Sequence, residues 1–170
     1  MAVAKALARE GFGVAVNGPS DDAELRGAVA EVSAIGRCVA VPFDVSDLSA
    51  QDAALATVEA ASGPLTTLVN NAGVGVLSRG DLLEVTEANW DRCLTVNSKA
   101  MFFLSQVFSR RLLSWARADV FHAIINVTSA NAIAVAVQRA EYCASKAAAA
   151  IVSKALAVRL GPENFAVYDV

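Results

Sequence analysis

Short, uninterrupted apolar runs alternate along this chain with segments of helical periodicity, and this alternation limits the fold more than any other feature. The runs predict five strands, with the sequences FGVAVN (12–17), RCVAVPFDV (37–45), LTTLVNNAG (65–73), HAIINVTS (122–129) and FAVYDV (165–170). Apolar residues fill both faces of these strands. That pattern is typical of a parallel sheet covered by helices on both sides. The sequence therefore predicts an α/β fold.

Helical periodicity and end signals predict the segments between the strands. Ser20 is expected to cap a helix that runs to about Ile35, and Thr86 a helical region that runs to about Trp115 with a break near Asn97. The other predicted helices span residues 1–10, 47–61 and 140–160, and the last is closed by Gly161-Pro162. The sequence holds no repeat, low-complexity segment or linker, which predicts a single domain over residues 1–170.

Composition excludes several classes of function. The chain is 55% hydrophobic and 18% charged, with a net charge of −3 and no Lys/Arg-rich run, so nucleic acid and anionic membranes are not expected as partners. No apolar run reaches the roughly 20 residues of a membrane span. Cys38, Cys93 and Cys143 lack C-x-x-C spacing and His122 is the only histidine, so we expect no metal site. The odd number of cysteines favours a reducing, cytoplasmic location.

Polar and small residues follow three of the predicted strands. They are Asp44-Val45, Asn70 to Gly73 and Thr128-Ser129. In open parallel sheets a ligand lies beyond the carboxyl ends of the strands. These residues are therefore candidates for holding a ligand against the backbone.

Tyr142 and Lys146 lie four residues apart in a predicted helix of mostly small, apolar residues, AEYCASKAAAA. Their side chains therefore share one helical face. A free tyrosine has a pKa of about 10 and is mostly protonated at neutral pH. A cation within about 4–6 Å favours the phenolate. A tyrosine next to a lysine is therefore a candidate general acid or base.

Each of these features also has a simpler interpretation when it is taken alone. A Tyr-x-x-x-Lys pair is usually an exposed helical pair, and NNAG is an ordinary turn sequence. Ser129 could be a turn cap, and Asn97 a polar helix residue that faces water. Cys143 is better explained by packing than by nucleophilic chemistry. Only their joint order on one alternating scaffold favours the functional interpretation.

Taken together, NNAG after a strand, Asn97 in a helix, Ser129 and YCASK resemble the short-chain dehydrogenase/reductase family over essentially the whole chain. Within that family, the segments VNNAGVG and WDRCLTVN most resemble the 3-oxoacyl-carrier-protein reductase-like branch. The resemblance implies a Rossmann-type, doubly wound parallel sheet and an NAD(P)-dependent oxidoreductase. It also implies hydride transfer between NAD or NADP and a small carbonyl or alcohol substrate, possibly a 3-oxoacyl thioester.

The resemblance also implies a role for each motif residue. Tyr142 exchanges a proton with the substrate oxygen, and Ser129 hydrogen-bonds the same oxygen. Lys146 contacts the nicotinamide ribose and favours the phenolate, while Asn97 anchors a water molecule of the proton relay.

Further residues are implied at the cofactor and at a subunit interface. Besides Tyr142 and Lys146, the cofactor is contacted by Asp44 and Val45 at the adenine and by Asn71, Ala72 and Gly73 in the cleft. NGPSDD, with Gly18 where an acid might select NAD, leaves NAD and NADP both open. Helices 97–115 and 140–160 are expected to form a homodimer or homotetramer.

The sequence departs from the family pattern in one important respect. The family begins with a strand and a Gly-rich turn, T-G-x-x-x-G-x-G, which binds the pyrophosphate, and no such motif occurs here. We therefore expect a chain truncated at both ends, from a gene product that begins about 15–30 residues earlier. Without that central strand, its two neighbours would lack hydrogen-bond partners. The alternative is a truncated or non-catalytic relative that keeps the fold and dimer face without binding dinucleotide.

Overall fold

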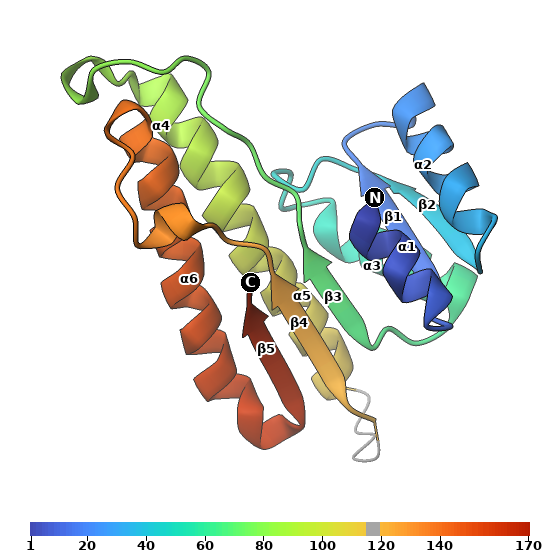
Figure 1. Cartoon of the computed structure of the whole chain (residues 1–170). Coiled ribbons are helices and arrows are strands. Elements are labelled where there is room, and N and C mark those ends of the chain that lie inside the picture. The colour runs from blue at the N-terminus through green and yellow to red at the C-terminus, as the bar shows by residue number, and fades with distance from the viewer. Residues whose placement is uncertain (115–119) are drawn as a thin grey trace. The chain divides into compact units, whose positions relative to one another are not determined.

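The computed structural model describes residues 1–114 and 120–170, and the chain divides into two units, Met1–Leu65 and Thr66–Val170. Figure 1 shows the elements from the amino terminus in blue to the carboxyl terminus in red. All strand pairs are parallel, as predicted. The strands form two sheets, however, of order β1-β2 and β3-β4-β5, where the strand pattern alone predicted one.

The first unit is a two-stranded sheet with three helices. Its elements are α1 (Ala2–Arg9), β1 (Val14–Gly18), α2 (Ala23–Ser33), β2 (Cys38–Pro42) and α3 (Gln51–Ser62). β1 and β2 pair in register from Val14 opposite Cys38 to Gly18 opposite Pro42. Two small apolar clusters form its core, one around Ala8, Val14 and Val32 and the other around Val41, Ala54 and Val58.

Local polar contacts move two helix starts away from their predicted positions. The cap of α2 is Asp22, whose carboxylate accepts a hydrogen bond from the Leu25 amide at 2.9 Å. Ser20, the predicted cap, donates to the same carboxylate at 2.8 Å, so that prediction was wrong by two residues. Helix α3 starts at Gln51 rather than at Asp47, because the Asp47 carboxylate accepts from the Ser49 amide at 3.0 Å and holds a turn there.

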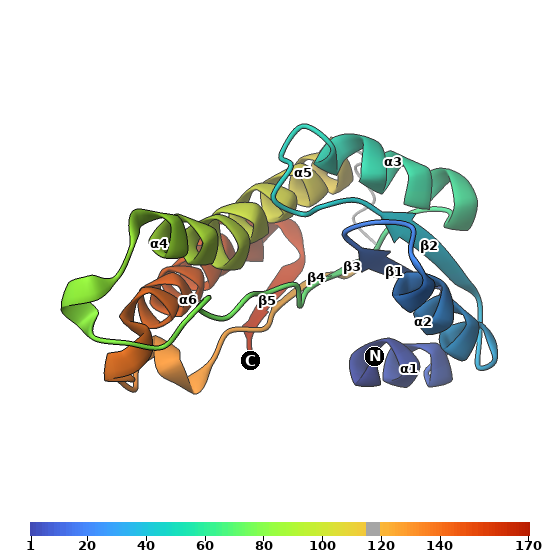
Figure 2. The same cartoon turned by 90° about the horizontal axis from the view of Figure 1, so that it is seen from above.

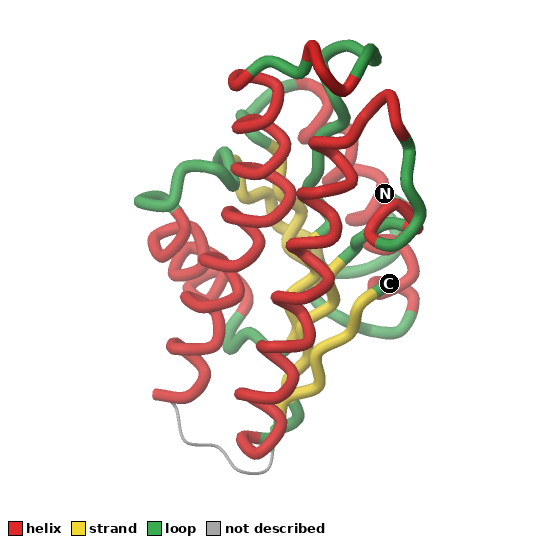
Figure 3. Tube along the Cα trace, turned by 90° about the vertical axis from the view of Figure 1, so that its left-hand side faces the viewer, coloured by secondary structure: helices red, strands yellow, loops and turns green. Residues whose placement is uncertain are grey.

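The second unit contains the remaining elements. They are β3 (Thr67–Asn70), η1 (Leu82–Glu84), α4 (Glu87–Leu94), η2 (Thr95–Ala100), α5 (Met101–Ser114), β4 (His122–Asn126), η3 (Ala130–Ala132), η4 (Val137–Arg139), α6 (Ala140–Leu160), η5 (Gly161–Glu163) and β5 (Phe165–Asp169). The helical region from α4 to α5 lies beside α6, and the two cover one face of the β3-β4-β5 sheet (Figures 2 and 3).

The helical region that contains Asn97 continues without the predicted break. Thr86 caps it as predicted and accepts a hydrogen bond from the Asn89 amide at 3.3 Å. Around Asn97 the backbone forms a π-helical segment, η2, between α4 and α5. The wider turn accommodates the irregularity inside one helical rod, and such segments are frequent at functional sites. The predicted end at Trp115 lies outside the described residues.

Buried amide side chains join the sheet of the second unit to its helices. The Asn70 amide on β3 donates to Asn126 Oδ1 on β4 at 2.8 Å and to Ser105 Oγ on α5 at 2.9 Å. The Asn126 amide in turn donates to Ser153 Oγ on α6 at 2.9 Å. Because both helices are anchored to the carboxyl ends of β3 and β4, the residues that follow these strands lie in a defined place against α6.

Candidate active site

Lys146 is the centre of a group of predicted residues in the second unit. It lies on the second turn of α6 with only 5% of its surface exposed. Its ammonium donates a hydrogen bond to the Val127 carbonyl, just after β4, at 2.9 Å. Burial lowers the pKa of Lys146 below its ordinary value because the charged form loses water. Among the described residues the ammonium has no carboxylate partner, so two of its hydrogens are available to a ligand.

Asn97 ties the loop after β3 to helix α6. The residue is 3% exposed, so the interpretation of Asn97 as a water-facing residue is wrong. Its Oδ1 accepts from the Val74 amide at 2.8 Å, and its amide donates to the Val74 carbonyl and to Ser145 Oγ, both at 2.9 Å. Ser145 Oγ donates onward to the Tyr142 carbonyl at 2.8 Å. The side chain thus sets the distance between the strand-end loop and the tyrosine turn.

Gly73 brings backbone close to both polar groups. A β-carbon at this position would lie 3.3 Å from Asn97 Oδ1 and 3.6 Å from Lys146 Nζ. A side chain would therefore occupy the space in front of the lysine, and glycine leaves it open. Asn71 and Ala72, which precede it, are exposed at the end of β3.

Tyr142 is partly buried one turn before Lys146. Lys146 Nζ lies 5.9 Å from the centroid of the Tyr142 ring, and Arg139 Cζ lies 5.2 Å from it. The tyrosine therefore has a cationic residue on the preceding turn and another on the following one. Both distances are within the range of a cation–π interaction.

Ser129 follows β4 and caps the short helix η3, where its Oγ accepts a hydrogen bond from the Asn131 amide at 3.1 Å. The turn-cap interpretation is thus confirmed. Capping uses Oγ only as an acceptor, so the hydroxyl hydrogen remains for a ligand. η3 packs against α6, although no hydrogen bond of the described residues joins Ser129 to Tyr142.

Asp44 and Val45 lie in the first unit, after β2, and make local hydrogen bonds. The Asp44 carboxylate accepts from the Ser46 amide and hydroxyl at 2.8 and 2.7 Å. The Val45 carbonyl accepts from the Gln51 side chain at 3.0 Å. Asp44 is exposed, so its second carboxylate oxygen is accessible to a ligand.

Two neighbours of the site had no signal in the sequence. Glu141, directly before Tyr142, is 1% exposed and accepts a hydrogen bond from the Asn89 amide of α4. Asn89 Oδ1 accepts from the Leu77 amide at 2.9 Å and so extends the link to the loop after β3. Neither residue belongs to a recognisable motif, because the pairing joins positions 52 residues apart.

The donor set fits the hydroxyl groups of a ribose, such as those of a dinucleotide. A buried ammonium with hydrogens to spare, a serine hydroxyl and a glycine that keeps space open suit a ligand rich in hydroxyl oxygens. In the part of the chain that the structure describes, no group of three or more His, Cys, Asp or Glu residues is arranged to hold a metal ion. No described helix is long and apolar enough to cross a membrane.

Comparison with solved structures supports the same fold. A 3-oxoacyl-[acyl-carrier protein] reductase from Brucella melitensis superposes with a TM-score of 0.92 at 27% identity, over 98% of this chain and 67% of that chain. A 3-oxoacyl-[acyl-carrier protein] reductase from Brucella melitensis has also been solved in complex with NAD. A putative short-chain alcohol dehydrogenase from Sinorhizobium meliloti 1021 gives a TM-score of 0.85 at 31% identity, over 98% of this chain and 64% of that one. The predicted Rossmann-type fold is confirmed.

Sequence relatives include dehydrogenases and reductases of sugars and sugar acids. L-xylulose reductase of Homo sapiens is 36% identical over 75% of this chain and 48% of its own length. Gluconate 5-dehydrogenase of Gluconobacter oxydans (strain 621H) is 31% identical over 95% of this chain and 60% of its own length. The chain spans about half of the length of the curated relatives it matches. The NAD complex agrees with the predicted nicotinamide cofactor. The short chain dehydrogenase family model matches residues 1–170, and the chain belongs to this family.

Proposed function

We propose that the protein containing this chain interconverts an alcohol and a carbonyl compound with NAD or NADP, and that Tyr142 is its general acid and base. The observation that carries the proposal is the buried Lys146 ammonium, 5.9 Å from the Tyr142 ring and without a carboxylate partner among the described residues. Burying an unpaired cation is costly. A ligand and a reaction that use the charge account for its retention.

The geometry supports a separate role for each side chain in the reaction. In the reducing direction Tyr142 gives its proton to the carbonyl oxygen, and the nearby ammonium stabilises the negative charge left on the phenol. Ser129 donates its hydroxyl hydrogen to the same substrate oxygen. The dinucleotide supplies the hydride in this direction and accepts it in the other.

Lys146 and Asn97 are proposed to position the ligand and the water molecules for that reaction. Lys146 uses one hydrogen on the Val127 carbonyl, which fixes the ammonium, and offers the others to the ribose hydroxyls. The Asn97 side chain is engaged with Val74 and Ser145. Because this side-chain amide is already hydrogen-bonded, we propose that Asn97 contributes to the proton relay by ordering a water molecule near the π-helical backbone. Within the second unit, Asn71, Ala72 and Gly73 belong to the proposed cofactor site. Asp44 and Val45 of the first unit are proposed as adenine contacts on the sequence resemblance alone.

The Tyr142→Phe variant tests the proposal. It removes the proton donor and keeps the ring, so turnover should fall by about 10²- to 10⁴-fold, while dinucleotide affinity stays within about twofold. Tyr168→Phe is the matched control, because Tyr168 is a 49% exposed tyrosine on β5. Near-normal turnover of Tyr142→Phe, or an equal loss in Tyr168→Phe, would refute the role.

The names of the relatives favour polyhydroxylated carbonyl compounds as substrates. The relatives include gluconate and xylulose enzymes, whereas the 3-oxoacyl thioester implied by the sequence wording is supported by a fold neighbour. The loop before Tyr142 also exposes Ile133 and Val135, at 92% and 84%, which suits an acyl chain. Assays with D-gluconate, L-xylulose and acetoacetyl thioesters discriminate between the two substrate classes.

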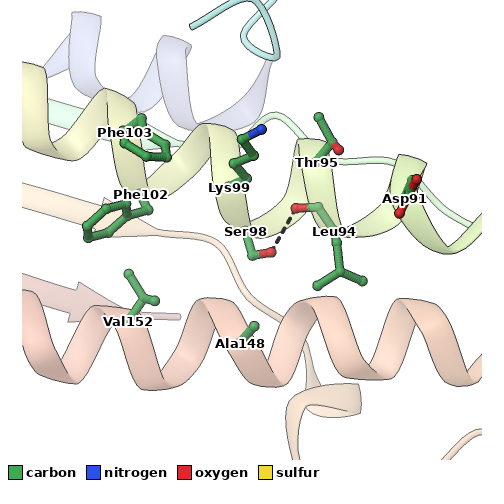
Figure 4. Close-up of a pocket in the computed structure, with 9 residues that line it drawn as sticks. All are labelled: Asp91, Leu94, Thr95, Ser98, Lys99, Phe102, Phe103, Ala148 and Val152. Carbon is green, nitrogen blue, oxygen red and sulfur yellow. Dashed lines mark hydrogen bonds between the residues drawn. The ribbon is translucent and has the colours of Figure 1, made fainter.

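We also propose a homodimer or homotetramer through helices 97–115 and 140–160. Between the helical region from α4 to α5 and helix α6 lies a groove of about 600 Å³, lined by Asp91, Leu94, Thr95, Ser98, Lys99, Phe102, Phe103, Ala148 and Val152 (Figure 4). Ile151, one residue from the lining, is 62% exposed on α6. The Ile151→Lys variant should sediment as a smaller species than the wild-type protein. The control, Val3→Lys on α1, should not change the sedimentation.

The alternative, a relative that keeps the fold and the dimer face without binding dinucleotide, is favoured by one observation. The strands form two separate sheets, and β1 and β3 each pair with one strand only. Titration of the gene product with NAD and NADP separates the two functions, because the alternative predicts no binding of either.

A further inference from the structure

Arg139 has a position that the assigned roles do not explain. It ends η4 and directly precedes α6, three residues before Tyr142. Its guanidinium carbon lies 5.2 Å from the centroid of the Tyr142 ring. The side chain is partly buried. The distance places it beside the group proposed to exchange a proton with the substrate.

The guanidinium has no anionic partner among the described residues. The nearest acid in sequence, Glu141, is buried and is used by Asn89. The loop hydrogen-bonded to η4, through the Gly80 amide and the Gln138 carbonyl at 3.4 Å, contributes another cation, Arg79. The same loop also carries an acid, Asp81, whose carboxylate accepts a hydrogen bond from the Leu83 amide at 2.9 Å. The charge of Arg139 beside the phenol is thus not paired with an acid among the described residues.

The surroundings of Arg139 strengthen its attraction for an anion. The loop that leads to it exposes apolar side chains at Ile133, Val135 and Val137, at 92%, 84% and 71%. A ligand that covers them excludes water and lowers the local dielectric constant, and a cation–anion contact then gains energy. A planar guanidinium matches a carboxylate with two parallel hydrogen bonds.

We infer that Arg139 binds a carboxylate of the substrate, and that the protein acts on hydroxy acids or oxo acids in preference to their neutral counterparts. The inference rests on the proposed function. A carboxylate fits better than a phosphate, because a single arginine balances one negative charge whereas a phosphate carries nearly two. The guanidinium, 5.2 Å from the ring centroid, places that carboxylate beside the tyrosine and so orients the substrate.

The test uses two probes that differ at one carbon, D-gluconate and D-glucitol, in which a hydroxymethyl group replaces the carboxylate. Steady-state oxidation of each by the gene product is measured with NAD and with NADP. The variants are Arg139→Gln, Arg139→Lys and Tyr142→Phe. Arg79→Gln is the matched control, since it removes the same charge from the neighbouring exposed loop.

The wild-type protein should favour D-gluconate, and Arg139→Gln should lower its kcat/KM roughly 10- to 100-fold, mainly through KM. The value for D-glucitol should stay within about twofold, and Arg139→Lys should fall between. Equal losses on both probes, the same loss in Arg79→Gln, no preference in the wild-type protein, or turnover of neither probe would overturn the inference. Normal turnover by Tyr142→Phe would instead refute the proposed function, whatever the ratio between the probes.

Discussion

Asn126 connects the sheet of the second unit to helix α6, and its replacement should destabilise the fold by a predictable amount. The side chain is fully buried. In Asn126→Ala the Asn70 amide keeps its bond to Ser105 and loses the acceptor of its other hydrogen. Ser153 Oγ keeps its bond to the Ala149 carbonyl. One orphaned buried donor costs about 1–3 kcal/mol, and the space left by the amide adds to that.

The expected loss in the free energy of unfolding is therefore about 2–4 kcal/mol, a large part of the roughly 5–15 kcal/mol of a typical protein. Urea unfolding of the gene product, followed by circular dichroism, measures it. The double variant with Asn70→Ala removes the orphaned donor as well, so its loss should be smaller than the sum of the two single losses. A loss below about 0.5 kcal/mol in Asn126→Ala, or strict additivity in the double variant, would refute this account of the network.

Three other predictions concern buried charge, pH and ligand binding. Lys146→Met should lower both turnover and dinucleotide affinity, because the ammonium is proposed to stabilise the Tyr142 phenolate and to bind the ribose. Unchanged affinity in calorimetry would contradict the cofactor role. Burial lowers the pKa of His122 below its ordinary value of 6.5, so the unfolded chain takes up the proton first and stability should fall as pH drops below about 6.5. His122→Phe, which keeps the ring contact with Phe165, should lose less stability between pH 7.5 and pH 5.5 than the wild-type protein, as denaturant unfolding at both pH values can show. The 170-residue chain expressed alone should bind neither NAD nor NADP measurably, because its sequence contains no Gly-rich turn to receive the pyrophosphate; micromolar binding in a titration would show that other residues suffice.

The sequence alone determined the class of fold and the candidate residues. Continuous apolar strands predicted parallel pairing, because helices cover both faces of a parallel sheet and the strands are therefore mostly apolar on both faces. Tyr142, Lys146 and Ser129 were found because their order along the chain is itself the signal. The cap of α2 was misassigned, since Ser20 and Asp22 can both cap a helix and only the backbone geometry selects one.

Only the tertiary structure decided which groups meet. The sequence placed Asn97 in the site, but only packing shows that its side chain is hydrogen-bonded to Val74 and Ser145. The Asn89–Glu141 contact joins two helices and has no local pattern. Arg139 became a candidate because its guanidinium lies near the ring of Tyr142 and has no carboxylate partner among the described residues. Periodicity reports which face of an element is apolar, whereas such contacts depend on how the buried faces of several elements fit together.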